Sequence, residues 1–248
     1  MQRLNKYIAS SGLCSRRKAD EFIESGQVSV NGKIVTELGY QIGKNDKVLI
    51  NNKQIKPLKL EYYRFYKPAG YITTSEDEKG RKTIYDVIPP ELKKLKPIGR
   101  LDRESTGLII MTNDGDLINE MTHPSIKIPK IYMVTINGKI TPEDGKKMFD
   151  GLEIEDDAGN KKTAFAEVFP IEITNKESTL RVTLYQGINR QIRKMFALLG
   201  FEVISLKRVQ HATITLVGIK KGQIKPMKPK QIKELKAFIN KIKRLNNA

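Results

Sequence analysis

The sequence has few of the residues that build disulfides or metal sites. Its one cysteine, Cys14, excludes an intramolecular disulfide and makes a reducing cytoplasm the expected location. With two histidines, His123 and His211, the chain is too poor in ligands for a usual zinc site. No hydrophobic run reaches membrane-spanning length, and no signal peptide opens the chain. The glycine-rich phosphate loop of nucleotide enzymes is also absent from the sequence.

Acidic residues are scarce relative to basic ones. The chain has 45 Lys and Arg against 28 Asp and Glu, a formal net charge of +17. Residues 1–60 hold 11 basic and 5 acidic side chains, and residues 227–248 hold 7 and 1. Both ends are therefore more basic for their length than the centre. An excess of this size favours a polyanionic partner, and RNA, DNA or an anionic membrane surface would each fit.

The first 60 residues predict a small domain. Hydrophobic spacing indicates helices over residues 3–10 and 16–25, with Ser15 as the N-cap of the second. Asn31-Gly32 between short alternating runs is a hairpin signal. Residues 53–60 are basic and broken by Pro57, as in a linker. We therefore expect one domain over residues 1–60 and a second over residues 61–248.

Residues 61–248 mix the two kinds of periodicity. Strands are predicted over residues 62–66, 108–111, 131–136, 178–185 and 201–209. Helices are predicted over residues 116–121, 142–149, from about 192 to 199, and over 231–244, where a basic amphipathic pattern favours packing onto the domain. The chain as a whole is predicted to be of the α+β class.

The stretch from Lys96 to Gly115, KPIGRLDRESTGLIIMTNDG, carries the strongest chemical pattern. Asp102 stands between Arg100 and Arg103 in a polar loop, which runs directly into the apolar residues 108–111. A loop fixed to a core strand can hold one carboxylate rigidly at the edge of a cleft. From spacing alone, a surface loop of solvated charges remains the alternative.

These runs resemble the signatures of a known family. GRLDRESTGLIIMTNDG, YKPAGYITT, Lys130-Ile131-Tyr132, GINRQIRKM and Leu206-Lys207-Arg208 are similar to motifs of bacterial ribosomal RNA pseudouridine synthases that carry an N-terminal S4 domain. RLNKYI, CSRRKAD and GQVSVNGK resemble the S4 domain itself. The resemblance implies a small αα-β S4 domain, followed by a catalytic domain with a mixed, mainly antiparallel sheet flanked by helices.

The resemblance also implies roles for individual residues. Asp102 matches the catalytic carboxylate, Tyr132 the residue that stacks on the target uracil, Arg193 the arginine that pairs with the aspartate, and Leu206 an apolar wall under the uracil. RNA contacts are expected from Arg3, Lys6, Arg16, Arg17, Lys18 and Lys33 in the S4 domain, and from Arg100, Arg103, Asn189, Arg190 and Lys194 in the catalytic domain. His123 is expected to be structural. The glycine usual after the Leu-x-Arg run is missing, and His211-Ala212 stands nearby.

The implied activity is the isomerisation of uridine to pseudouridine, which requires no cofactor or metal. Asp102 could attack C1′ of the ribose or remove the 2′ proton, and both routes stay open. Asn189-Arg190-Gln191 resembles the types of synthase that act on large ribosomal RNA, known as the B and F types. This points to 23S ribosomal RNA, with 16S ribosomal RNA or transfer RNA as alternatives. A non-catalytic RNA-binding ribosome assembly factor is the alternative of another class. We expect a cytoplasmic monomer that binds RNA and no membrane.

Overall fold

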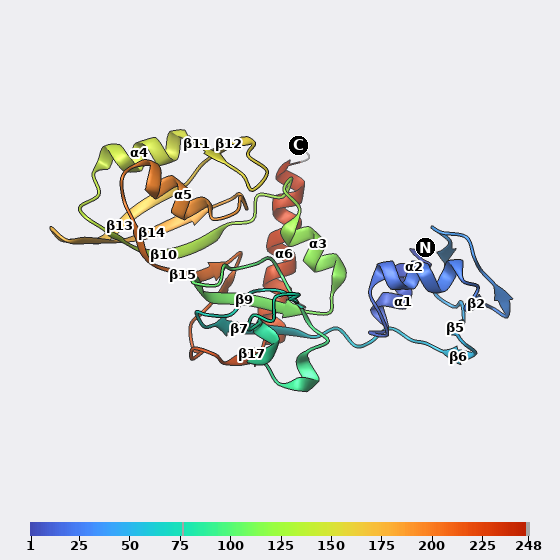
Figure 1. Ribbon diagram of the computed structural model, residues 1–248. Coiled ribbons are helices and arrows are strands. Elements are labelled where there is room, and N and C mark those ends of the chain that lie inside the picture. Colours follow the sequence, from blue (N-terminus) through green and yellow to red (C-terminus); the bar gives the residue numbers. More distant parts are fainter. Residues whose placement is uncertain (76, 247–248) are drawn as a thin grey trace. The chain divides into compact units, whose positions relative to one another are not determined.

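The computed structural model describes residues 1–75 and 77–246 (Figure 1). In it, the first 61 residues form a unit of their own, which also includes Asn113–Gly115. Helices α1 (Leu4–Ser10) and α2 (Arg16–Glu24) accompany a sheet with strand order β3-β2-β5-β6 and a small β1-β4 pair. The strands are β1 (Gln2–Arg3), β2 (Val28–Val30), β3 (Lys33–Ile34), β4 (Gln41–Ile42), β5 (Val48–Ile50) and β6 (Lys53–Gln54). One side of each helix meets the sheet in a core that includes Leu4, Ile8, Ala19, Ile23, Val28 and Val48.

Local chemistry fixes the ends of these elements. The Ser15 hydroxyl accepts a hydrogen bond from the Lys18 backbone N–H at 3.2 Å, which caps α2. Asn31 and Gly32 have φ of 52° and 82°, the left-handed pair that joins antiparallel strands most tightly, and Val30 pairs with Lys33 across the turn. The predicted N-cap and the predicted hairpin are both confirmed.

The second unit is built on a sheet that has nine strands among the residues described (Figure 1). Its main order is β13-β14-β10-β15-β9-β7-β17, with β16 paired to β15 and β8 to β9. Neighbours run antiparallel, except that β9 and β15 are parallel. The strands are β7 (Tyr62–Lys67), β8 (Lys96–Pro97), β9 (Thr106–Thr112), β10 (Lys130–Asn137), β13 (Glu167–Ile173), β14 (Glu177–Leu184), β15 (Val203–His211), β16 (Ile214–Thr215) and β17 (Ile224–Pro226). The expected mixed, mainly antiparallel α+β fold is confirmed.

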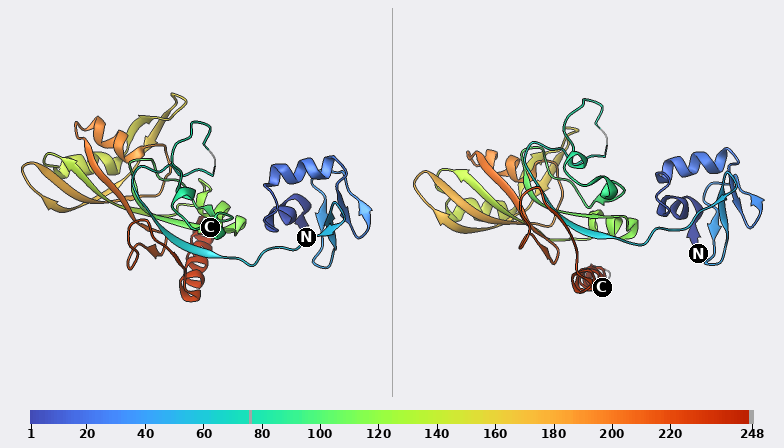
Figure 2. Two further views of the ribbon diagram at one scale, coloured as in Figure 1. Left: turned by 60° about the horizontal axis from the view of Figure 1, so that its bottom comes forward. Right: turned by 90° about the horizontal axis from the view of Figure 1, so that it is seen from below.

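Helices cover both faces of this sheet. They are α3 (Gly115–Thr122), α4 (Pro142–Asp150), α5 (Gln191–Leu198) and α6 (Pro229–Asn246), with 3₁₀ turns η1 (Ile84–Asp86) and η2 (Pro90–Leu92) and a separate hairpin of β11 (Leu152–Glu155) and β12 (Lys161–Ala164). In Figure 2, α6 (red) lies on the side of the sheet opposite α5 (orange).

The side chains of strand β9 point alternately to the two faces of the sheet, which explains why two cores form. Ile109 and Met111 join the core that contains residues of α4 and α5, whereas Leu108 and Ile110 join the core that contains residues of α3 and α6. Successive side chains of a strand point to opposite faces, so an uninterrupted apolar run must be covered on both sides. Leu235 and Ile239 of α6 are fully buried, which confirms that this helix packs onto the domain. Within residues 1–75 and 77–246, no helix has the length and apolar character needed to cross a bilayer.

Candidate active site

The loop that carries Asp102 leads directly into buried strand β9. Gly99 bends the chain with φ of 73°, and the Asp102 carbonyl accepts a hydrogen bond from the Ser105 N–H at 3.1 Å. Leu101 and Ser105 are buried on either side of Asp102, which is half-buried. The aspartate therefore stands on a short loop that is anchored in the core at both ends.

A buried lysine fixes the backbone of this loop by hydrogen bonds. Lys67, the last residue of β7, is fully buried, and its Nζ donates to the carbonyls of Asp102 at 2.9 Å, Ser105 at 2.7 Å and Pro68 at 3.0 Å. The Arg103 carbonyl is a fourth acceptor at 3.3 Å. Burial lowers the pKa of Lys67 to about 8, while the carboxylates of Asp102 and Glu104 act in the opposite direction. At neutral pH the side chain is therefore an ammonium with three N–H groups to donate.

The segment that follows Lys67 adds two more links. The Gly70 N–H donates to the Arg103 carbonyl at 2.8 Å, and the Thr73 hydroxyl donates to the Leu101 carbonyl at 2.8 Å. The sequence motif Lys67-Pro68-Ala69-Gly70 by itself predicts only a turn beside the cleft. Its lysine is a residue that sequence reasoning missed, although its place in a recognised motif was a signal.

Lys67→Met is expected to lower the free energy of unfolding by about 2–5 kcal/mol, because it leaves several buried carbonyls without a donor. It should also lower turnover, because the Asp102 loop loses its anchor. Thermal melting and initial rates measure the two effects. Lys139→Met, at an exposed position on the same domain, is the control and should change neither. A Lys67→Met protein that melts and turns over like the wild type would exclude this anchoring role.

A cleft of about 1290 Å³ opens over the Asp102 loop. Its wall includes the loop itself, the start of β10, the end of β15 and the segment before α5. Among the described residues that line it, eight are Lys or Arg and three are Asp or Glu. The cleft therefore places the Asp102 carboxylate within a mainly basic wall, which suits a polyanion that must come close to a carboxylate.

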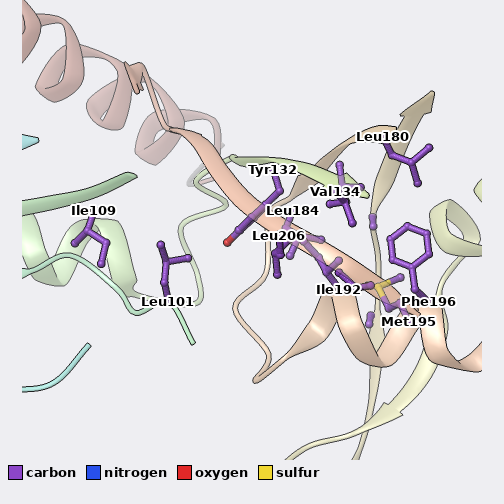
Figure 3. Close-up of a cluster of buried hydrophobic side chains, with 14 of the residues drawn as sticks. Leu101, Ile109, Tyr132, Val134, Leu180, Leu184, Ile192, Met195, Phe196 and Leu206 are labelled. Atoms are coloured by element: carbon purple, nitrogen blue, oxygen red, sulfur yellow. The ribbon is translucent and has the colours of Figure 1, made fainter. Parts of the chain in front are cut away.

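An aromatic ring and an aliphatic side chain line the cleft on adjacent strands. Tyr132 of β10 and Leu206 of β15 are each 8% exposed, and both line the same cleft as Asp102. Figure 3 shows the Tyr132 side chain near Leu206, with its hydroxyl pointing toward the segment that carries Leu101, the neighbour of Asp102. Such a pair can hold a flat base by stacking, since a phenol ring gives a broad apolar face with one polar tip.

Comparison with known proteins gives this arrangement a family. The family model described as RNA pseudouridylate synthase matches residues 61–198, which is more than half of the chain. The chain belongs to the RNA pseudouridylate synthase family. The S4 domain model matches residues 2–48, so this pseudouridylate synthase carries an N-terminal S4 domain.

Relatives of the synthase match over most of its length. It is 38% identical over 238 residues to ribosomal large subunit pseudouridine synthase B of Bacillus subtilis (strain 168), covering 96% of this chain and 97% of the relative. It is 40% identical over 224 residues to the dual-specificity RNA pseudouridine synthase RluF of Escherichia coli (strain K12), covering 89% and 73%. A crystal structure of a pseudouridylate synthase matches with a TM-score of 0.67 and 27% identity, covering 95% of this chain and 100% of the other.

Most of the predicted catalytic-domain residues meet at the cleft of the synthase. The lining contains Asp102, Tyr132 and Leu206 together with the expected RNA contacts Arg100, Arg103, Asn189 and Arg190. Arg190 has φ of 51°, and its Nη1 lies 3.3 Å from the Glu104 carboxylate. His123 is exposed at the rim, where its Nδ1 lies 2.7 Å from the Ser125 hydroxyl.

Two residues of the α5 motif have partners away from Asp102. Arg193 donates from Nη1 to the Val203 carbonyl at 3.0 Å, and the ion pair with Asp102 that the resemblance predicts is not formed in the described chain. The pKa of Glu104 is lowered by its own backbone N–H and also by the charges of Arg190 and Arg193. Lys194 donates to the Glu155 carbonyl at 2.6 Å, and its Nζ lies 3.8 Å from the Asp157 carboxylate.

The basic residues predicted in the S4 domain lie at or near its surface. Five of them are exposed and Lys6 is half-buried; the five are Arg3, Arg16, Arg17, Lys18 and Lys33. Lys18 pairs with Glu21 on the same helix at 2.6 Å. Arg16 and Arg17 open α2 with their side chains in solvent, where phosphates can reach them.

Ala212 stands near the place where the resemblance leads one to expect a glycine. Ala212 has φ of 53°, a left-handed conformation that glycine adopts without steric cost. The chain thus has a left-handed residue, an alanine, directly after β15. His211, just before it, is fully buried and lines the cleft, a position that the sequence did not reveal.

Proposed function

We propose that this synthase converts a uridine of 23S ribosomal RNA to pseudouridine, with Asp102 as the catalytic carboxylate. The observation that carries the proposal is the placement of Asp102, Tyr132 and Leu206 in one basic cleft of a family member. The relative named as a synthase of the large ribosomal subunit supports ribosomal RNA as the substrate class.

The reaction breaks the N1–C1′ bond, turns the base and joins C5 to C1′, and the proton on C5 is replaced by one on N1. Positive character develops on the ribose when the first bond breaks, so a fixed carboxylate stabilises the transition state. Asp102 acts either by adding to C1′ or by removing the 2′ proton. The enzyme must reach both C1′ and C5 and turn the base, so the target nucleotide must leave its stack, and Tyr132 and Leu206 then hold the base.

Tritium release from RNA containing 5-labelled uridine tests the activity, because the C5 hydrogen is lost only if the new bond forms. We expect release from 23S ribosomal RNA, and mapping of pseudouridines with and without the protein then locates the uridine. Tritium release from 16S ribosomal RNA or transfer RNA alone would show that the substrate is that RNA and not 23S ribosomal RNA. Tight binding without release from any RNA would instead favour a ribosome assembly factor.

The proposal includes a monomer that works in the cytoplasm on ribosomal RNA or an assembly intermediate. The family membership and the S4 domain support an RNA partner. The single cysteine agrees with a reducing compartment.

The S4 domain is expected to contribute phosphate contacts that do not depend on sequence. Arg16→Ala combined with Arg17→Ala should weaken RNA binding and reduce the slope of log K against log salt by about 0.7–1.8, because each lost phosphate contact contributes roughly 0.7–0.9. Turnover at saturating RNA should not change. Isotherms at several salt concentrations measure the slope. Lys220→Ala with Lys221→Ala removes the same charge from an exposed site on the catalytic domain, and an equal slope change there would argue against a specific S4 role.

A further inference from the structure

The register of β10 and β15 brings three basic side chains together beside Tyr132. Lys130 pairs with His211 and Tyr132 pairs with Arg208 across β10 and β15, and a bulge lies between these two pairs. Arg208 and His211 are three residues apart, so on a regular strand they would face opposite sides of the sheet. The bulge adds one residue, Val209, and both side chains therefore face the same side. Lys130, Tyr132, Arg208 and His211 consequently all line the same cleft.

The basic cluster of Lys130, Arg208 and His211 is largely buried, and no acidic side chain among the described residues forms an ion pair with it. Arg208 is 1% exposed and His211 is 0% exposed. The Arg208 Nε donates to the Leu108 carbonyl at 2.7 Å. Its Nη2 and both ring nitrogens of His211 are buried and have no hydrogen-bond partner within residues 1–75 and 77–246. Leaving such groups unpaired costs about 1–3 kcal/mol each, so the cluster is built to receive a ligand or solvent.

The electrostatics of the cluster point to a negative ligand. Burial and, to a smaller extent, the charge of Arg208 together lower the pKa of Lys130 to about 8. Burial also holds the pKa of His211 well below its usual range, with added effects from Arg208 and Lys130. Among the described residues, the charged groups that shift these two pKa values are Arg208 and Lys130. A bound anion would reduce the repulsion between these two cations.

Lys130 is the most exposed member of the cluster. It is half-buried, and its Nζ makes two long contacts, at 3.4 Å each, to the carbonyls of Ile128 and Gln186. Its ammonium can therefore turn toward a ligand at little cost. Arg208 and His211 neighbour it on β15 and act as positioning residues. Arg208 adds positive potential, and the neutral His211 imidazole helps to form the floor of the cleft.

We propose that the basic cluster binds a backbone phosphate that flanks the target uridine, with Lys130 as the contact residue. The inference rests on the proposed RNA substrate and deepens it. A phosphate carries the full negative charge that the cluster lacks, whereas uracil is neutral and already has a stacking surface in Tyr132 and Leu206. Holding that phosphate beside the ring of Tyr132 would keep the everted nucleotide in place while its ribose faces Asp102.

A double-mutant cycle between protein and RNA tests the phosphate contact. Stem-loops that contain the mapped uridine are made with one neutral methylphosphonate, either 5′ or 3′ of that nucleotide. Affinities are measured with Lys130→Met, in an Asp102→Asn background so that the RNA is not consumed. Lys130→Met should weaken binding of the all-phosphate RNA about 10-fold, the scale of one charge-assisted hydrogen bond. With one of the two methylphosphonate RNAs, Lys130→Met should weaken binding by less than about twofold, because the charge that Lys130 contacts is already absent.

Lys127→Met is the matched control, because Lys127 is an exposed lysine of the same cleft. Lys127→Met should change the affinity by the same factor for the all-phosphate RNA and for the two methylphosphonate RNAs. An effect of Lys130→Met that is equal on all three RNAs overturns the proposal and would favour a contact with the base. A loss of turnover by Lys130→Met with Asp102 intact and unchanged affinity also overturns it, in favour of proton transfer. Turnover of the unmodified stem-loop by the wild type tests the proposed function separately.

Discussion

Replacing Asp102 with asparagine is expected to abolish pseudouridine formation while leaving RNA affinity within a few-fold of the wild type. The amide keeps the shape of the side chain but can neither add to C1′ nor accept the 2′ proton. The loss should reach about 10³-fold or more, since acid–base and electrostatic contributions of one group are of this order. The loop should stay in place, because Lys67 and Ser105 contact the Asp102 carbonyl and not its side chain. Tritium release and binding isotherms measure the two quantities.

Glu104→Gln is the matched control for this experiment. Glu104 lies two residues away on the same loop, and its exposed carboxylate pairs with Arg190 at 3.3 Å. Removing this charge should change turnover only a few-fold. Pseudouridine formation by Asp102→Asn at more than a small fraction of the wild-type rate would rule out Asp102 as the catalytic carboxylate. Loss of activity only in Glu104→Gln would transfer the role to Glu104.

Gly107→Ala is expected to damage the fold of the catalytic domain itself. A Cβ at Gly107 would lie 2.2 Å from the Arg208 carbonyl oxygen and 2.6 Å from its backbone nitrogen, and φ at Gly107 is 115°. Both obstacles are backbone atoms of β15, which is hydrogen-bonded in parallel to β9 at this point. Overpacking and strain each cost about 1–3 kcal/mol. The melting temperature should fall by about 10 °C or more, with loss of activity because β9 and β15 both position the walls of the cleft.

Gly145→Ala provides the comparison for a glycine without such a neighbour. Gly145 lies in α4, a Cβ there meets nothing within 4 Å, and its φ is ordinary. Alanine should stabilise the helix by roughly 0.5–1 kcal/mol. Thermal melts of both variants in the absence of RNA separate folding from chemistry. A Gly107→Ala protein that melts like the wild type would show that β9 and β15 can move apart without cost.

Sequence reasoning was most successful where the information is local. The apolar run before Asn113 predicted a strand, the Asn31-Gly32 pair predicted a hairpin, and Ser15 predicted a helix start, and each is present. These features depend on neighbours within a few residues, so their physical cause is visible in the printed sequence. The placement of Asp102 in a loop before a core strand belongs to the same class.

Features that depend on distant contacts were not predictable in this way. The Lys67 ammonium meets carbonyls about 35 residues further along the chain, and nothing near Lys67 reveals that it will be buried. The bulge beside Val209 turns His211 into the cleft against the regular alternation of a strand. The Arg193 guanidinium is held by the Val203 carbonyl at the start of β15, so the expected partner in the Asp102 loop is not reached.

The parallel pairing of β9 with β15 has a consequence for synthesis on the ribosome. It joins Thr106 and Gly107 to Lys207 and Arg208, which are separated by about 100 residues of chain. Contacts of such long range form late, after the intervening segments have been made. In a nascent chain the carboxylate loop is consequently made about 100 residues before the opposing wall, and the cleft cannot close until β15 has been synthesised.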